Sequence, residues 1–149
     1  MTPEQVVRDF LSAFETSGVE KATTYLTDDV VISTVNPPTQ GGKEAFIGQV
    51  TLIKEAIPDY RWGVQQMTTD DNKVAVKMRW TGTNTGPFRL SAFVPGAPDV
   101  PATGKKVSVP DNFVFTVRDD KISGMHIDSG PNAGLFEMLQ QLGVTLPQM

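Results

Sequence analysis

The apolar residues of this chain change their spacing at Pro58, and this change constrains the fold more than any other feature of the sequence. Before Pro58, apolar residues recur every three or four positions and form one stripe of a helix. That stripe consists of Phe46, Val50, Ile53 and Ile57. After Pro58, apolar and polar residues alternate, which is typical of strands with one buried face. Helices followed by strands predict an α+β domain.

Two further helices are expected before this stripe. The first has Pro3 at its opening position and ends at Gly18, because proline favours a helix start and glycine a helix end. A short second helix is predicted at residues 19–26 and an apolar strand at residues 30–32. Residues 36–42 are rich in proline and glycine and are predicted to form a loop.

The second half of the chain is predicted to form a sheet. Its strands are expected at residues 60–67, 73–83, 105–118 and 121–128. We expect one curved antiparallel sheet that wraps around the N-terminal helices as a cone, followed by a short C-terminal helix, with residues 1–149 forming one domain. The mouth of such a cone can hold a small molecule.

Composition excludes several classes of function. The net charge is −4 and no basic cluster is present, which argues against nucleic acid or an anionic membrane as the main partner. The absence of cysteine excludes disulfides and thiol catalysis, and a single histidine excludes a multi-histidine metal site within one chain. No apolar run is long enough to span a bilayer. We therefore expect a cytoplasmic protein without a metal or cofactor.

The last predicted strand carries the strongest chemical signal. Strict alternation places four of its residues on one face: Ile122, Gly124, His126 and Asp128. If that face lines a cavity, Asp128 is a candidate general base and His126 its partner, since desolvation raises the basicity of a carboxylate. The alternatives are an Asp128 that caps the following turn and a His126 that bonds to the backbone.

Three more polar residues are candidates for the same site. Asn84 and Asn112 are possible hydrogen-bond donors to an enolate oxygen, although Asn84 lies in a glycine-rich turn that asparagine also favours. Asp111 and Asn112 are adjacent in a strand, so one of them faces each side of the sheet. If Asp111 is the inward residue, it is a rival base to Asp128.

Aromatic side chains in the strands are numerous enough to line a flat pocket, although such positions usually form core. The candidates are Tyr60, Trp62, Trp80 and Phe113. Residues 87–101 are a possible lid or dimer contact, because apolar side chains are unusual in a loop. Those side chains include Phe88, Leu90, Phe93 and Val94. Arg79 is a candidate for binding a carboxylate or phosphate, although an outward strand arginine is also ordinary.

Several motifs resemble the SnoaL-like polyketide or ester cyclases of the nuclear-transport-factor-like superfamily. They are WTGTNTGPF at residues 80–88, PATGKKVSV at 101–109, DDKI at 119–122 and LQQLGV at 139–144. The resemblance covers nearly the whole chain. It implies a cone-shaped α+β fold and cofactor-free aldol ring closure of a polyketide ester. It also implies an acid–base aspartate on a late strand, for which Asp128 is the nearest candidate.

Three functions follow. The first is a cofactor-independent cyclase, isomerase or lyase that acts on a small apolar or aromatic carbonyl compound. The second is hydrolysis of an epoxide or ester by water held between a carboxylate and a histidine. The third is a non-catalytic ligand-binding module, since the family commonly has histidine where Asn84 stands and tryptophan where His126 stands. A homodimer is expected by analogy with the fold.

Overall fold

The computed structural model describes residues 2–35, 38–89, 91, 96, 98–128 and 134–143. The helices are α1 (Pro3–Thr16), α2 (Val19–Thr23), α3 (Lys43–Ala56) and α4 (Gly134–Gln141). The strands are β1 (Leu26–Val35), β2 (Pro38–Gly41), β3 (Val64–Asp70), β4 (Lys73–Thr83), β5 (Lys106–Arg118) and β6 (Lys121–Ile127). In this described part of the chain, no helix combines the length and the hydrophobicity needed to cross a membrane.

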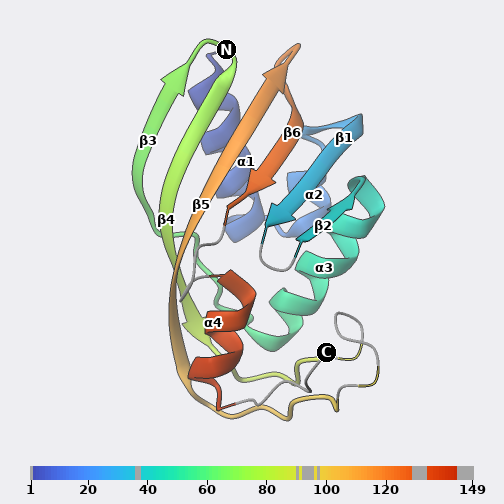
Figure 1. The fold of residues 1–149 in the computed structure, drawn as a ribbon, viewed down its shortest axis with the longest axis vertical. Helices are drawn as coiled ribbons and strands as arrows, with labels where there is room; N and C mark the ends of the chain where they lie inside the picture. Colours follow the sequence, from blue (N-terminus) through green and yellow to red (C-terminus); the bar gives the residue numbers. More distant parts are fainter. Residues whose placement is uncertain are drawn as a thin grey trace.

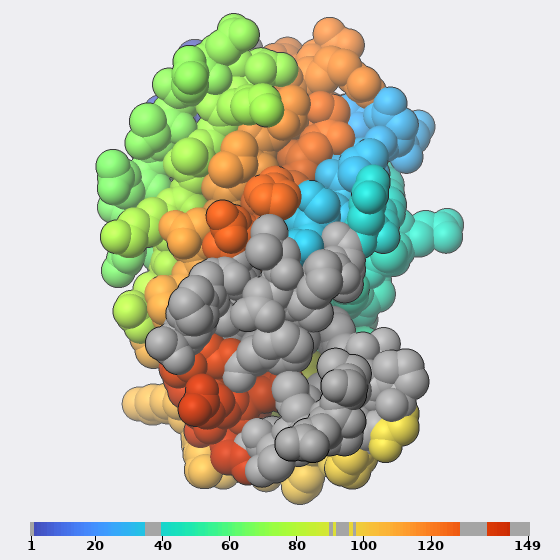
Figure 2. Space-filling model, viewed as in Figure 1, coloured from blue at the N-terminus to red at the C-terminus, as the bar shows by residue number. Residues whose placement is uncertain are grey.

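The strands form one curved sheet in the order β2-β1-β6-β5-β4-β3 (Figure 1). Seen from the same side, β3 and β4, then β5 and β6, then β1 follow one another across the surface (Figure 2). The predicted α+β cone is confirmed. Several details of the prediction were wrong. The strand expected at residues 60–67 is β3 at Val64–Asp70, and the helix expected at residues 19–26 ends at Thr23. β1 pairs with β6 in parallel, so the sheet is mixed, and the predicted loop at residues 36–42 contains β2, which pairs with β1.

Helix α1 lies against the buried face of the sheet and contacts β3, β4, β5 and β6 (Figure 1). The Thr2 hydroxyl caps its start by accepting a hydrogen bond from the Gln5 backbone N–H at 3.2 Å. Its apolar stripe faces inward, and the ring of Phe10 lies 6.0 Å from that of Phe115 in β5. The core of the molecule therefore lies between α1 and the central strands.

Strands β4 and β5 show the predicted alternation without interruption. In β4 the buried residues are Val74, Val76, Met78 and Trp80. In β5 they are Val107, Val109, Asp111, Phe113, Phe115 and Val117. The two strands pair in register along their length, so one regular surface carries most of the buried aromatic side chains.

Strand β6 departs from alternation at a bulge. Thr116 pairs with Gly124, whereas the next residue, Val117, pairs with Ile122, so Ser123 is the extra residue in β6. As a result Ile122 and Met125 are both buried, although they are three positions apart. The prediction that Ile122 and His126 share a face was wrong, because a bulge reverses the direction of every side chain that follows it.

Helix α4 covers the part of the β5 edge that β6 does not reach. The side-chain amide of Gln141 accepts a hydrogen bond from the Ser108 backbone N–H at 2.9 Å and donates one to the Ser108 carbonyl at 2.8 Å. The amide thus makes the two backbone hydrogen bonds that a neighbouring strand would otherwise make with Ser108. The possible lid also joins the core, since Phe88 is fully buried and pairs with Val100. Its other apolar residues, Leu90, Phe93 and Val94, lie outside the described residues.

Candidate active site

Asp111 is the one buried carboxylate among the described residues, with 4% of its surface exposed. The alternation of β5 places it inward between Val109 and Phe113, whereas Asn112 is exposed. Trp80 Nε1 donates a hydrogen bond to Asp111 Oδ2 at 3.3 Å. The Asn112 backbone N–H donates to Asp111 Oδ1 at 2.9 Å. Sequence reasoning left open which of the two residues faces inward, and the structure places Asp111 there.

Tyr60 lies in the same buried cluster. Its ring centroid is 5.4 Å from that of Trp80 and 5.0 Å from that of Trp62. Burial of the phenol holds the pKa of Tyr60 well above its usual value, and the negative charges of Asp111 and then Glu15 raise this pKa further. The phenol is therefore protonated throughout the physiological pH range and can donate a hydrogen bond. Phe113 completes the cluster, with its ring 5.6 Å from that of Trp62.

Trp62 is held in place by a turn of the backbone and by α1. Gly63 has a φ of +59°, a conformation that favours glycine, and its carbonyl accepts a hydrogen bond from the Arg79 backbone N–H at 2.9 Å. The Trp62 backbone N–H donates to Glu15 Oε1 at 2.7 Å. The buried Trp62 Nε1 has no hydrogen-bond partner in the described part of the chain. A buried donor is thus available beside Glu15.

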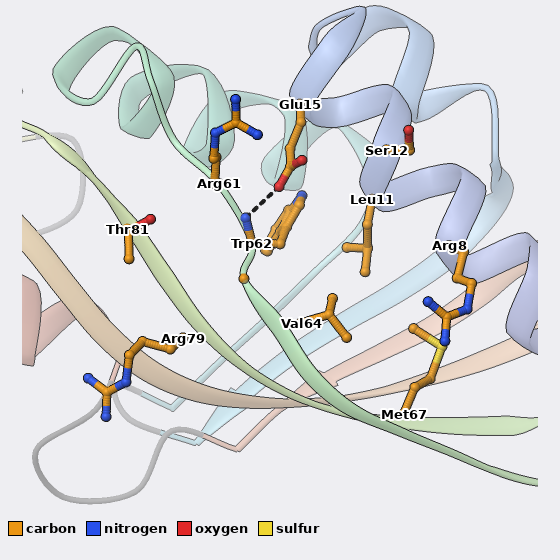
Figure 3. Close-up of a pocket in the computed structure, with 11 residues that line it drawn as sticks. Arg8, Leu11, Ser12, Glu15, Arg61, Trp62, Val64, Met67, Arg79 and Thr81 are labelled. Atoms are coloured by element: carbon orange, nitrogen blue, oxygen red, sulfur yellow. Dashed lines mark hydrogen bonds between the residues drawn. The ribbon is translucent and has the colours of Figure 1, made fainter.

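A groove of about 460 Å³ opens between α1 and the segment that leads into β3 (Figure 3). Its apolar lining is Leu11, Trp62, Val64 and Met67, and its charged lining is Arg8, Glu15, Arg61 and Arg79. A second hollow of about 500 Å³ shares Arg61 and Thr81 with it and reaches Ser108 and Gln141. Asp111 is in neither lining. The groove therefore meets the buried cluster at Trp62.

His126 and Asp128 lie on the opposite face of the sheet from Asp111. Both are exposed, and His126 Nδ1 is 2.8 Å from the hydroxyl of Ser33 in β1. The Asp128 backbone N–H donates to the Asn112 carbonyl at 2.9 Å. The expectation that their shared face lines a cavity was based on alternation through Ser123, where the bulge lies. Their catalytic roles stay predictions, without the desolvation that motivated them.

Asn84 is fully buried, and its side-chain amide links three separate backbone segments by hydrogen bonds. Its Nδ2 donates to the carbonyls of Ala56 at 3.0 Å and Gly86 at 2.9 Å. Its Oδ1 accepts from the backbone N–H and the hydroxyl of Thr103, at 2.9 and 2.8 Å. Both amide hydrogens are used inside the protein, which matches the alternative of a structural turn asparagine. Asn112 faces solvent opposite Lys77.

Glu15 and Arg61 were not among the residues selected from the sequence. The signal for Glu15 was present, since Val7, Leu11 and Glu15 follow at intervals of four and lie in one row of α1. A carboxylate in an otherwise buried row is unusual and indicates a polar function. Arg61 had no comparable signal, because its place at the groove depends on a bridge to Thr81 in β4 and on the turn at Gly63.

A search of the described residues finds no group of three or more His, Cys, Asp or Glu side chains that could hold a metal ion. The polar groups that meet in the interior are instead one carboxylate, one phenol and two indole N–H groups. Such a set can accept a proton from a substrate and donate hydrogen bonds to an oxygen.

The geometry agrees with comparisons to known proteins. A family model for the SnoaL-like domain matches residues 7–125. The chain belongs to the SnoaL-like family. The matched part of this SnoaL-like chain contains Glu15, Tyr60, Trp80 and Asp111, whereas His126 and Asp128 lie beyond its end. A search of the curated proteins gives no match.

Solved structures share the fold of this SnoaL-like protein. A provisionally named SnoaL-like polyketide cyclase from Jannaschia sp. CCS1 is 20% identical, with a TM-score of 0.74 over 97% of this chain and 93% of that chain. IdmH from Streptomyces antibioticus, provisionally named a polyketide cyclase, is 24% identical, with a TM-score of 0.72 over 97% and 100%. AclR from Streptomyces galilaeus, provisionally named a hydroxylase, is 17% identical, with a TM-score of 0.78 over 97% of both chains.

Proposed function

We propose that this SnoaL-like protein is a cofactor-independent enzyme that enolises a small carbonyl compound by acid–base catalysis, with Asp111 as the general base. The observation that carries this proposal is the burial of the Asp111 carboxylate among aromatic rings, where Trp80 donates a hydrogen bond to it. A carboxylate that is shielded from water is well suited to taking a proton from a carbon next to a carbonyl.

The neighbouring residues supply the remaining roles. The Tyr60 phenol stays protonated because burial and the charges of Asp111 and Glu15 raise its pKa, so it is a hydrogen-bond donor for the oxygen that becomes negative. Trp80 orients Asp111 through its hydrogen bond to Oδ2. The rings of Trp62 and Phe113 pack edge to face beside this cluster, and Trp62 also lines the groove, an aromatic surface that suits an aromatic or polyketide-like substrate.

The reaction class is ring closure or isomerisation within one molecule. Asp111 takes the proton from the carbon next to the carbonyl, and the electron pair of that C–H bond forms an enolate. In ring closure the enolate carbon attacks a second carbonyl of the same substrate, and the new alkoxide takes up a proton. The substrate and product then have the same atoms, so no cofactor or co-reactant is needed. The names of IdmH and the Jannaschia protein support a polyketide substrate.

The test is proton exchange at carbon. The wild type, Asp111→Asn and the control Asp128→Asn are incubated with 1-tetralone or methyl phenylacetate in deuterated water, and loss of the signal of the hydrogen next to the carbonyl is followed by NMR. We expect Asp111→Asn to lower the enzymatic exchange rate by at least about 100-fold, the usual contribution of a general base. The control is expected to keep that rate. Equal exchange in wild type and Asp111→Asn contradicts the assignment.

A non-catalytic ligand-binding module is the second candidate. It is favoured by one observation, namely that Asp111 lines neither of the two described hollows. A module of this kind binds the same probes without exchanging their hydrogens, so calorimetric binding combined with absent exchange in the wild type supports it over the enzyme.

A further inference from the structure

We propose that the groove between α1 and β3, here called the α1–β3 groove, binds a small amphipathic anion: an apolar chain or ring with one carboxylate or phosphate. The groove holds about 460 Å³ and is lined by four apolar side chains and three arginines. Because Asp111 is absent from this lining, the inference does not depend on Asp111 being a catalytic base.

The charge of the groove favours an anion. Three of its side chains are cationic and only Glu15 is anionic. Arg8 pairs with Glu4 at 3.4 Å, and Arg79 donates to the Ser108 hydroxyl at 3.3 Å. The hydrogen bonds and ion pairs found among the described residues include none for the Arg61 guanidinium. Arg61 is therefore the group that can bind a carboxylate or phosphate through two parallel hydrogen bonds.

The walls of the groove favour an apolar body on this anion. Leu11 and Trp62 are buried, Met67 is half-buried, and Val64 is one of the two most exposed large apolar residues of the described chain, at 39%. Figure 3 shows Trp62 beside Arg61, with Leu11, Val64 and Met67 on the far side of Trp62 from Arg61. A ligand with its charged end at Arg61 can lay a hydrocarbon chain or ring over these four side chains.

Trp62 adds a second polar feature that points to a ligand. Trp62 is a buried core residue with 3% of its surface exposed, yet its Nε1 has no hydrogen-bond partner within the described residues. Leaving a buried donor unpaired is unfavourable, because the group loses the hydrogen bonds that water would give it. Trp62 belongs to the groove wall, so a ligand that shifts its indole slightly would give this donor an oxygen partner.

The charge of Glu15 predicts the direction in which a substitution changes the affinity for an anion. Its Oε1 accepts a hydrogen bond from the Trp62 backbone at 2.7 Å, so the carboxylate is fixed at the groove wall. Its negative charge opposes a bound anion. Removing the charge with Glu15→Gln keeps an oxygen that can accept the Trp62 hydrogen bond, and is therefore expected to strengthen binding.

The experiment uses octanoate, octyl phosphate and the uncharged control 1-octanol, titrated into the full chain by isothermal calorimetry. We expect at least one anion to bind more tightly than 1-octanol. Arg61→Gln should weaken this binding at least about tenfold, because glutamine lacks the charge that strengthens the hydrogen bonds to the anion. The matched control is Arg118→Gln, which changes the net charge equally but removes a partner of Asp29 outside the groove. The ratio between octanoate and octyl phosphate shows which head group the site prefers.

A second readout locates the ligand. The bromine of 8-bromooctanoate quenches nearby tryptophan fluorescence, so it should quench the wild type much more than Trp62→Phe, in which only Trp80 remains. Three results overturn the proposal: no binding of either anion, equal affinity for 1-octanol, or equal weakening by Arg61→Gln and Arg118→Gln. Weaker binding by Glu15→Gln in a variant that stays folded by circular dichroism also overturns it.

Discussion

Trp80 and Asp111 are diagonal neighbours on two paired strands, and the indole Nε1 of one donates to the carboxylate of the other at 3.3 Å. Trp80 faces Val109 across the β4–β5 ladder, and Asp111 faces Met78, two positions further along. Diagonal neighbours on one face of a sheet are within reach of long aromatic side chains. The regular register of these two strands therefore fixes the Asp111 carboxylate and its hydrogen-bond donor together.

Replacing Trp80 is expected to destabilise the fold more than replacing Trp62. Trp80→Phe removes a donor from the buried Asp111, which costs about 1–3 kcal/mol beyond the lost packing. Trp62→Phe loses similar volume but removes a buried N–H that has no partner among the described residues. Urea unfolding of the two variants gives the difference between their unfolding free energies. Equal losses contradict a stabilising Trp80–Asp111 bond.

Asn84→Ala is expected to be strongly destabilising. The Asn84 amide makes hydrogen bonds to Ala56, Gly86 and Thr103, and alanine leaves those buried groups unpaired at about 1–3 kcal/mol for each one that water does not reach. Asn112→Ala is the control, because Asn112 is exposed and such changes usually alter stability by about 0.5 kcal/mol or less. Thermal and urea unfolding measure both. A catalytic rather than structural Asn84 would instead leave stability nearly unchanged.

Stability should fall above about pH 10 because of Tyr60. Its pKa in the folded protein lies well above the usual value of 10.0, so the folded state keeps a proton that the unfolded state loses. The stabilisation is complete below pH 10 and decreases as the pH rises beyond it, by up to about 1.4 kcal/mol per pH unit. Tyr60→Phe lacks this contribution. The difference in unfolding free energy between wild type and Tyr60→Phe is measured from about pH 8 to about pH 11, and a constant difference contradicts the prediction.

Gly63→Ala is expected to destabilise the protein by at least about 1–3 kcal/mol, the usual cost of a sparsely populated backbone conformation. The glycine has a φ of +59°, and an added Cβ would lie 2.1 Å from the Arg79 carbonyl oxygen. Gly48→Ala in α3 is the matched control, since an added Cβ there has no neighbour within 4 Å. Alanine is favoured over glycine within helices, so this control should gain about 0.5–1 kcal/mol. Chemical unfolding of both variants tests the contrast.

His126→Gln and Asp128→Asn are expected to keep turnover within about threefold of wild type, whereas Asp111→Asn loses the rate of a general base. The reason is exposure, since neither His126 nor Asp128 is shielded from water. The comparison is made in the proton-exchange assay at several pH values. A large loss in Asp128→Asn with normal exchange in Asp111→Asn would instead assign the base to Asp128, which directly follows β6.

The sequence predicted well those elements in which local pattern and tertiary environment agree. β4 and β5 alternate strictly because both are central strands with one face on the core, and the apolar stripe of α1 faces that core. The helix start at Pro3 and the end of helical spacing before Pro58 are local signals and were read correctly. Because β5 alternates strictly, Asp111 is buried on the same face as Val109 and Phe113.

The sequence failed where pairing with a distant strand decides the local structure. β1 extends over Leu26–Val35, beyond the apolar residues 30–32, because Leu26 pairs with β6 and because Ser33 and Thr34 pair with both β2 and β6. The bulge at Ser123 depends on the register between β5 and β6 and reversed the assignment of His126. The position of Arg61 at the groove depends on its backbone bridge to Thr81 in β4 and on the turn at Gly63, whose carbonyl bonds to the Arg79 N–H.

The parallel pairing of β1 with β6 has a consequence for how the chain folds. Ser33 and His126, which meet in this pairing, are 93 positions apart in the sequence. During synthesis, the segments of β1 and β2 are therefore made long before β6, the strand that connects them to the rest of the sheet. Contacts between such distant segments slow folding, because a long loop must close before they form. During that interval the unpaired edge of β1 is open to association with other chains, so production at lower temperature should increase the yield of folded protein.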